Sequence, residues 1–131
     1  MERRMSMSND DFFGFVLMPF AKDFDDTYRL GIKEAAKSVP GLRVERLDEQ
    51  MFDEGMLERI YRQIDVADVI VADLSKRNPN VFYELGYAHA KGKLTILLTR
   101  EVADLPFDLK HRKCIVYDSL HELQAQLVQH F

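Results

Sequence analysis

The sequence predicts an α/β fold in which one parallel sheet carries helices on both faces. Short apolar runs alternate along the chain with amphipathic stretches that have the spacing of helices. The first of these runs, Phe12–Met18, is continuously apolar, as expected for a parallel strand that is covered on both faces. The 131 residues suit a single domain.

Five apolar runs have the length of strands. The second of these runs alternates apolar and polar residues, which favours a place at the sheet edge. Because strands and helices alternate, the pattern predicts right-handed crossovers and a flavodoxin-like (Rossmann-like) doubly wound sheet in the order 2-1-3-4-5. The expected strands are Phe12–Met18, Leu42–Leu47, Val69–Leu74, Leu94–Thr99 and Cys114–Tyr117.

Four helices are expected between and after these strands. Pro40 and Gly41 stop the first helix, and Asn78-Pro79 is a strong start signal for the third, since Asn caps and Pro favours the first helical position. A capping box at Ser119 opens the fourth helix. The helical stretches run from Phe24 to Val39, from Met56 to Ile64, from Asn78 to Gly92, and from Ser119 onward.

The amino-terminal end differs in character from the rest of the chain. Residues 1–11 are polar and aperiodic, and we expect them to be flexible, with a single domain over residues 12–131. The apolar run from Phe12 to Ala21 lacks the flanks of a signal peptide and is too short to span a bilayer. We therefore expect a core strand in a soluble, cytoplasmic protein.

Composition excludes several classes of function. The net charge of -4 and the pI of about 5.5 disfavour a general nucleic-acid binder. The single cysteine, Cys114, excludes an internal disulfide and is expected to be a small buried hydrophobe. The four histidines lack metal-ligand spacing, so we expect no metal site and no cofactor. Dinucleotide-binding, P-loop, response-regulator and nucleophile-elbow motifs are not present in the sequence.

Glu84 is the first candidate for chemistry. It lies two turns into the third helix, near the strand edge where ligands bind in open parallel sheets. Helical geometry places it at the margin of the core stripe made by Val81, Leu85 and Ala88, with Tyr87 beside it. The alternative is a boundary glutamate in an ion pair, for example with Lys91.

Two aspartates follow strands. Asp73 ends the third expected strand, where a carboxylate meets either a ligand or the amides of Ser75 and Lys76. Asp48 stands in a similar place after the second strand. Both are candidate substrate-binding residues, and for both a purely structural role remains open.

Apolar and basic groups reach the same edge. Met18, Pro19 and Phe20 close the first strand and offer an apolar wall to a flat ring, unless they form the edge of the core. The segment Pro106-Phe107-Asp108 follows the fourth strand as a lid or as an ordinary connection. Lys76, Arg77 and the start of the third helix offer positive potential to a phosphate, or form an exposed basic loop.

The third strand and the helix after it carry a family resemblance. Ala67-Asp-Val-Ile-Val-Ala-Asp73 followed by Asn78-Pro-Asn-Val-Phe-Tyr-Glu-Leu-Gly-Tyr-Ala-His-Ala90 resembles the nucleoside 2-deoxyribosyltransferase-like superfamily, and looks most like its bacterial TIR-like predicted nucleotide-binding branch. Phe15–Phe20 and Leu105–Leu109 fit that branch. The resemblance spans Phe12 to Tyr117, and its members include transferases, nucleoside, nucleotide and NAD hydrolases, and non-catalytic domains.

The resemblance implies that Glu84 acts at the anomeric carbon of a ribosyl group. A carboxylate there stabilises or traps the oxocarbenium-like state of N-glycosidic cleavage. Asp73 would then hold ribose hydroxyls or tune Glu84. The transferase pattern places an acid in the loop before the glutamate, whereas here the nearest polar group is Asn80. Hydrolysis or simple binding therefore fits better than deoxyribosyl transfer.

Three hypotheses follow. The first is an N-glycosidase that cleaves a nucleotide or NAD as substrate, with Glu84 essential. The second is a non-catalytic, TIR-like module that binds or senses a nucleotide or assembles with itself. The third is a purely structural interaction domain. A homo-oligomer is possible in view of the transferase relatives, whereas nucleic-acid and membrane partners are not expected.

Overall fold

The computed structural model describes residues 12–50, 55–106 and 113–131. The sheet has five parallel strands in the order β2-β1-β3-β4-β5, as predicted. The strands are β1 (Phe12–Leu17), β2 (Leu42–Arg46), β3 (Val69–Asp73), β4 (Thr95–Thr99) and β5 (Cys114–Val116). Each is one residue shorter than expected, because the chain enters or leaves a turn at that end.

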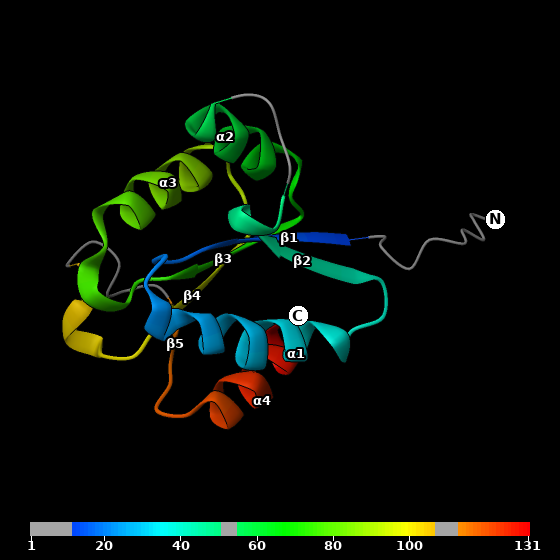
Figure 1. The fold of residues 1–131 in the computed structure, drawn as a ribbon, viewed down its shortest axis with the longest axis vertical. Coiled ribbons are helices and arrows are strands. Elements are labelled where there is room, and N and C mark those ends of the chain that lie inside the picture. The colour runs from blue at the N-terminus through cyan, green and yellow to red at the C-terminus, as the bar shows by residue number, and fades with distance from the viewer. Residues whose placement is uncertain (1–11, 51–54, 107–112) are drawn as a thin grey trace.

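Helices cover both faces of the sheet (Figure 1). One face carries α2 (Met56–Val66) and α3 (Pro79–Ala90), and the other carries α1 (Glu34–Lys37) and α4 (Leu120–His130). Short 3-10 turns follow three of the strands or their loops, at Leu47–Glu49, Ser75–Arg77 and Val102–Asp104.

The first predicted helix differs from a regular α-helix. A 3-10 turn at Lys22–Phe24 is followed by a π-helical stretch, Thr27–Lys33, and only then by α1. Gly31 lies within the π-helical stretch, and a Cβ there would meet Leu123 Cδ2 of α4 at 2.8 Å. A glycine at this point therefore lets the two helices approach closely.

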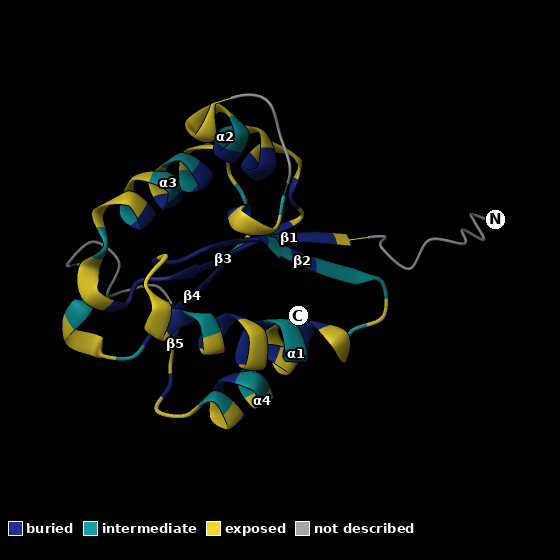
Figure 2. Ribbon diagram, in the orientation of Figure 1, coloured by how far each residue is buried: buried dark blue, intermediate teal, exposed yellow. Residues whose placement is uncertain are grey.

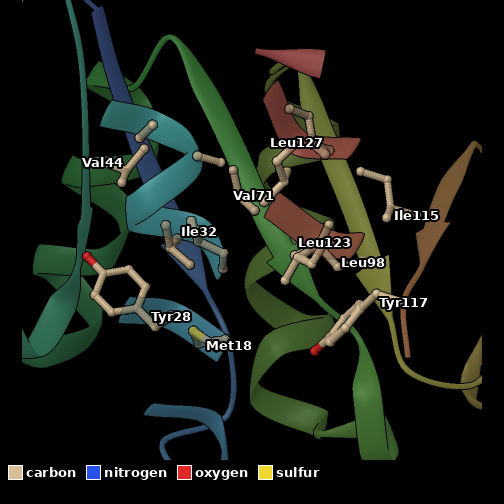
Figure 3. Packing of buried hydrophobic residues seen from close by; sticks show 14 of the residues in the cluster. Met18, Tyr28, Ile32, Val44, Val71, Leu98, Ile115, Tyr117, Leu123 and Leu127 are labelled. Carbon is tan, nitrogen blue, oxygen red and sulfur yellow. The ribbon is translucent and has the colours of Figure 1, made fainter. Parts of the chain in front are cut away.

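The core lies in two layers, one on each side of the sheet. Figure 2 shows buried strands between helices whose outer surfaces are exposed. Alternate residues of β1 point to opposite layers: Val16 packs towards α1 and α4, whereas Phe15 and Leu17 pack towards α2 and α3. Figure 3 shows the first layer, in which Leu123 and Leu127 of α4 meet the sheet. The alternation fixes which strand side chains reach each helical layer.

The capping residues predicted at the helix ends form the expected caps. The Asn78 side chain caps α3 by accepting hydrogen bonds from the Asn80 and Val81 amides. Gly92 lies just beyond α3 with φ of 72°, in the left-handed conformation that ends helices. Ser119 caps α4 through the Glu122 amide. Cys114 is half-buried rather than fully buried, because β5 lies at the edge of the sheet.

The described part of the chain has no helix that is both long and apolar enough to cross a membrane. Within the same residues, no cluster of three or more His, Cys, Asp or Glu could hold a metal ion.

Candidate functional site

A pocket of about 310 Å³ opens at the carboxyl end of β1, on the face covered by α2 and α3. Its size is at the lower end of the range for small-molecule sites. Side chains of β1, α2 and α3 form most of its wall. The lining residues are Phe15, Val16, Leu17, Met18, Pro19, Phe20, Leu47, Met56, Leu57, Ile60, Asn78, Asn80, Val81 and Glu84.

Glu84 is the one ionisable side chain among these lining residues, all of which lie in the described part of the chain. Val81 and Leu85 are buried as the helical stripe predicted, which leaves Glu84 half-buried at the margin of α3. Burial raises the pKa of its carboxyl to about 7. A carboxyl with this pKa is present in both protonation states near neutral pH.

The alternative considered from the sequence, an ion pair of Glu84 with Lys91, does not form. Lys91 instead lies 3.7 Å from Asp65 of α2. No other described residue donates a hydrogen bond to the Glu84 carboxyl or forms an ion pair with it. Burial is the cause of its raised pKa. The carboxyl therefore faces the pocket with its hydrogen-bonding capacity unused by the described protein.

Met18, Pro19 and Phe20 all line the pocket, as the strand-end argument predicted. Phe20 is 58% exposed, so part of its ring is accessible to a ligand. Met56 and Leu57 of α2 add further apolar side chains to the pocket lining. The lining thus suits a flat, weakly polar group.

Asparagines supply the polar part of the wall. Asn80 is exposed beside the pocket, where the sequence placed it as a candidate. Asn78 also lines the pocket, although sequence reasoning recognised it only as a helix cap. The sequence indicates its cap position, but its place in the pocket lining depends on the packing of α3 beside the end of β1.

The start of α3 already has its amide groups satisfied. The Asn78 side chain accepts hydrogen bonds from the Asn80 and Val81 amides, and the Asn78 backbone carbonyl accepts one from the Phe82 amide. Pro79 has no N–H to offer. An anion bound directly to these amides would have to displace the cap, which weakens the expectation of a phosphate held by the helix backbone.

The loop before α3 is held in an unusual backbone conformation. Lys76 and Arg77 have φ of 63° and 55°, in the left-handed region that non-glycine residues rarely adopt. The Lys76 amide donates to Asp104 and its ammonium group to Asp23. The Lys76 ammonium is thus paired with a carboxylate and is not among the pocket-lining groups.

Asp73 is fully buried and is not among the pocket-lining residues. One carboxyl oxygen accepts from the Ser75 amide at 2.9 Å, which is the turn-capping arrangement considered from the sequence. The other accepts from the Tyr117 hydroxyl at 2.6 Å. Burial raises the pKa of the Asp73 carboxyl, and these hydrogen bonds oppose that rise.

Arg100 adds further hydrogen bonds to the network around Asp73. Its guanidinium donates to the Tyr117 hydroxyl, to the Thr27 hydroxyl and to the Asp23 backbone carbonyl. It also lies over the Phe24 ring, 3.9 Å from the centroid. These contacts join the ends of β4 and β5 to the turn after β1.

Asp48 lies in a second recess of about 420 Å³. The recess shares Phe20, Leu47 and Met56 with the pocket, so the two are neighbours. Both Asp48 oxygens accept from the buried Arg46 guanidinium, at 2.9 and 2.8 Å. This bidentate pair fixes Asp48 near the pocket but outside its lining.

Tyr87 points away from the pocket lining. Its hydroxyl donates to Asp65, and its ring packs against Tyr61 with centroids 4.3 Å apart. Phe107 and Asp108 lie outside the described residues. The structure therefore brings Met18, Pro19, Phe20, Asn80 and Glu84 together, places Asp48 beside them, and leaves Asp73 and Tyr87 outside.

Comparison with known proteins finds solved structures with a similar fold. No family model and no curated protein matches the chain. A solved 2-desoxiribosyltransferase from Leishmania mexicana is similar at TM-score 0.62 and 23% identity, over 91% of this chain and 98% of that one. The CMP N-glycosidase BcmB from Clostridium botulinum is similar at TM-score 0.69 and 20% identity, over 91% and 99%. The chain shares the fold of these two proteins.

Proposed function

We propose that the protein cleaves the N-glycosidic bond of a nucleotide or NAD, with Glu84 at the anomeric carbon. The observation that carries the proposal is an unpaired, half-buried carboxyl in a pocket at the carboxyl edge of the sheet. The two structural neighbours are named for chemistry at this kind of bond, which supports the same reaction class.

In the proposed reaction the bond between the anomeric carbon and the base breaks, and its electron pair leaves with the base. The ionised Glu84 carboxylate stabilises the oxocarbenium-like sugar or forms an ester with it, and water then adds to the anomeric carbon. The apolar wall near Phe20 would hold the base. NAD would need no acid for its leaving group, since its nicotinamide already carries a positive charge.

A neutral base leaves more easily when an acid protonates it. No second ionisable side chain lines the pocket among the described residues. This observation favours the second candidate function, a nucleotide-binding or sensing module of TIR-like type that lacks turnover. The two candidates share the ligand class and differ in whether the base is released.

The test is to incubate the protein with NAD and with nucleoside monophosphates, and to follow free base by chromatography. Glu84→Gln keeps the shape and removes the charge, so we expect base release to fall by about 100-fold or more. Glu101→Gln, at an exposed position outside the pocket, is the matched control and should release base at the unchanged rate.

Base release at equal rates in the wild type and Glu84→Gln would reject the proposed role of Glu84. Absence of release together with a ligand-dependent rise in melting temperature would favour the binding module. Absence of both would reject a nucleotide ligand among those tried and leave the interaction domain as the better description.

A further inference from the structure

Asn78 has a hydrogen-bonding group that its cap does not use. Its Oδ1 accepts from the Asn80 amide at 2.9 Å and from the Val81 amide at 3.2 Å. Because both partners are backbone donors, this side of the side chain must be the oxygen. The Nδ2 group therefore points away from the helix amides, and no described residue accepts a hydrogen bond from it.

The position of Asn78 brings this amide close to the pocket. Asn78 is half-buried and belongs to the pocket lining together with Asn80 and Glu84. The cap fixes the side-chain orientation before any ligand arrives, so a ligand contact would involve little further ordering. Asn78 thus presents two N–H donors in a fixed direction, whereas Glu84 presents a carboxyl.

We propose that the Asn78 side-chain amide donates a hydrogen bond to an acceptor oxygen of the substrate and so determines which substrates are used. The inference rests on the proposed function. The helix rise places Asn78 about 9 Å along α3 from Glu84. With the anomeric carbon at Glu84, the acceptor is an oxygen at one end of the substrate, either on a 5′-phosphate or on the base.

Two substitutions separate capping from donation. Asp and Ser cap helices about as well as Asn, but neither has the amide N–H groups. Asn78→Asp and Asn78→Ser should therefore melt within a few degrees of the wild type. Both substitutions should lower kcat/KM by about tenfold, which is the effect of one lost hydrogen bond.

The choice of substrates identifies the acceptor. A nucleoside monophosphate and its nucleoside should be compared, as should a cytosine and a uracil nucleotide. Loss confined to the phosphorylated compound assigns a phosphate oxygen to Asn78, and loss that depends on the base assigns a base carbonyl. Asn80→Asp, which adds the same charge on the same side of the pocket, controls for repulsion.

Failure of the Asn78 inference can be distinguished from failure of the proposed role of Glu84. If the wild type releases base and both Asn78 variants keep its kcat/KM, the inference is wrong while the proposed function stands. If Asn78→Asp is impaired and Asn78→Ser is not, the effect is repulsion by the new charge and the inference is again wrong. If the wild type releases no base from any compound, the proposed function is wrong. In that case nucleotide affinity is measured by calorimetry, and unchanged affinity in both Asn78 variants rejects the inference as well.

Discussion

Glu84 and Asp73 are two carboxyl groups near the same edge of the sheet, and the protein surrounds them in opposite ways. Burial raises the pKa of both. Asp73 is completely enclosed and uses its two oxygens on the Ser75 amide and the Tyr117 hydroxyl. Glu84 faces a pocket and has no such donor among the described residues. Because the pKa of both carboxyls is raised, the pKa alone does not distinguish them, whereas the presence or absence of protein partners does.

The largest expected effect is at Asp73. Asp73→Ala would leave the Ser75 amide and the Tyr117 hydroxyl buried without their acceptor. We expect a loss of about 2–4 kcal/mol in the free energy of unfolding, measured by urea denaturation. Asp73→Asn should lose less, because its amide oxygen still accepts from Ser75 and the Tyr117 hydroxyl can rotate to accept from its NH₂. Equal stability of Asp73→Ala and the wild type would remove the distinction between the two carboxyls.

A smaller effect is expected from the ionisation of Glu84. The folded protein holds the pKa of Glu84 at about 7, above the ordinary glutamate value of 4.5. The folded state therefore binds more protons between these values, and the contribution of Glu84 to stability is present below about pH 4.5 and is lost as pH rises to 7. Glu84→Gln should thus gain stability over the wild type across this window, by about 1–2 kcal/mol at pH 8 after allowance for solvent screening.

Unfolding at several pH values checks this prediction. The difference between Glu84→Gln and the wild type is the quantity to measure, since it cancels the titration of Asp73. A difference that stays constant from pH 4.5 to pH 8 would mean that Glu84 is not desolvated as the pocket implies.

The smallest expected effect lies in the loop between the two carboxyls. Arg77 has φ of 55°, so Arg77→Gly should relieve backbone strain and stabilise the fold by about 0.5–1 kcal/mol, measured by thermal unfolding. Lys76→Gly relieves similar strain but also removes the ion pair with Asp23, and should gain less. Destabilisation by Arg77→Gly would show that the Arg77 side chain contributes more than its conformation costs.

The sequence was sufficient for most of the fold because its signals are local. The apolar runs predicted all five strands to within one residue at each end, and Asn78-Pro79 predicted the start of α3. The π-helical stretch at Thr27–Lys33 was not predicted, since its apolar spacing of three and four residues is also that of an α-helix.

The site was predicted less completely because it depends on distant contacts. Glu84 and the segment Met18–Phe20 were found from their place at the strand edge, and the pocket contains them. Asp73 stands at an equivalent place in the sequence, but Tyr117, far along the chain, binds its outer oxygen. The pair of Asp48 with Arg46 is a local contact, two residues apart, but strand periodicity alone does not indicate it. Which strand-end carboxyl remains open to a ligand is therefore a tertiary property.

The central place of β1 in the sheet has a consequence for how the chain is made. Within this chain β1 precedes both of its hydrogen-bonding neighbours, β2 and β3. The apolar segment Phe12–Leu17 therefore emerges from the ribosome with both edges unpaired and waits for β3 before its sheet can close. During that interval the nascent chain exposes an unpaired apolar strand, which is the kind of segment that aggregates before a fold is complete.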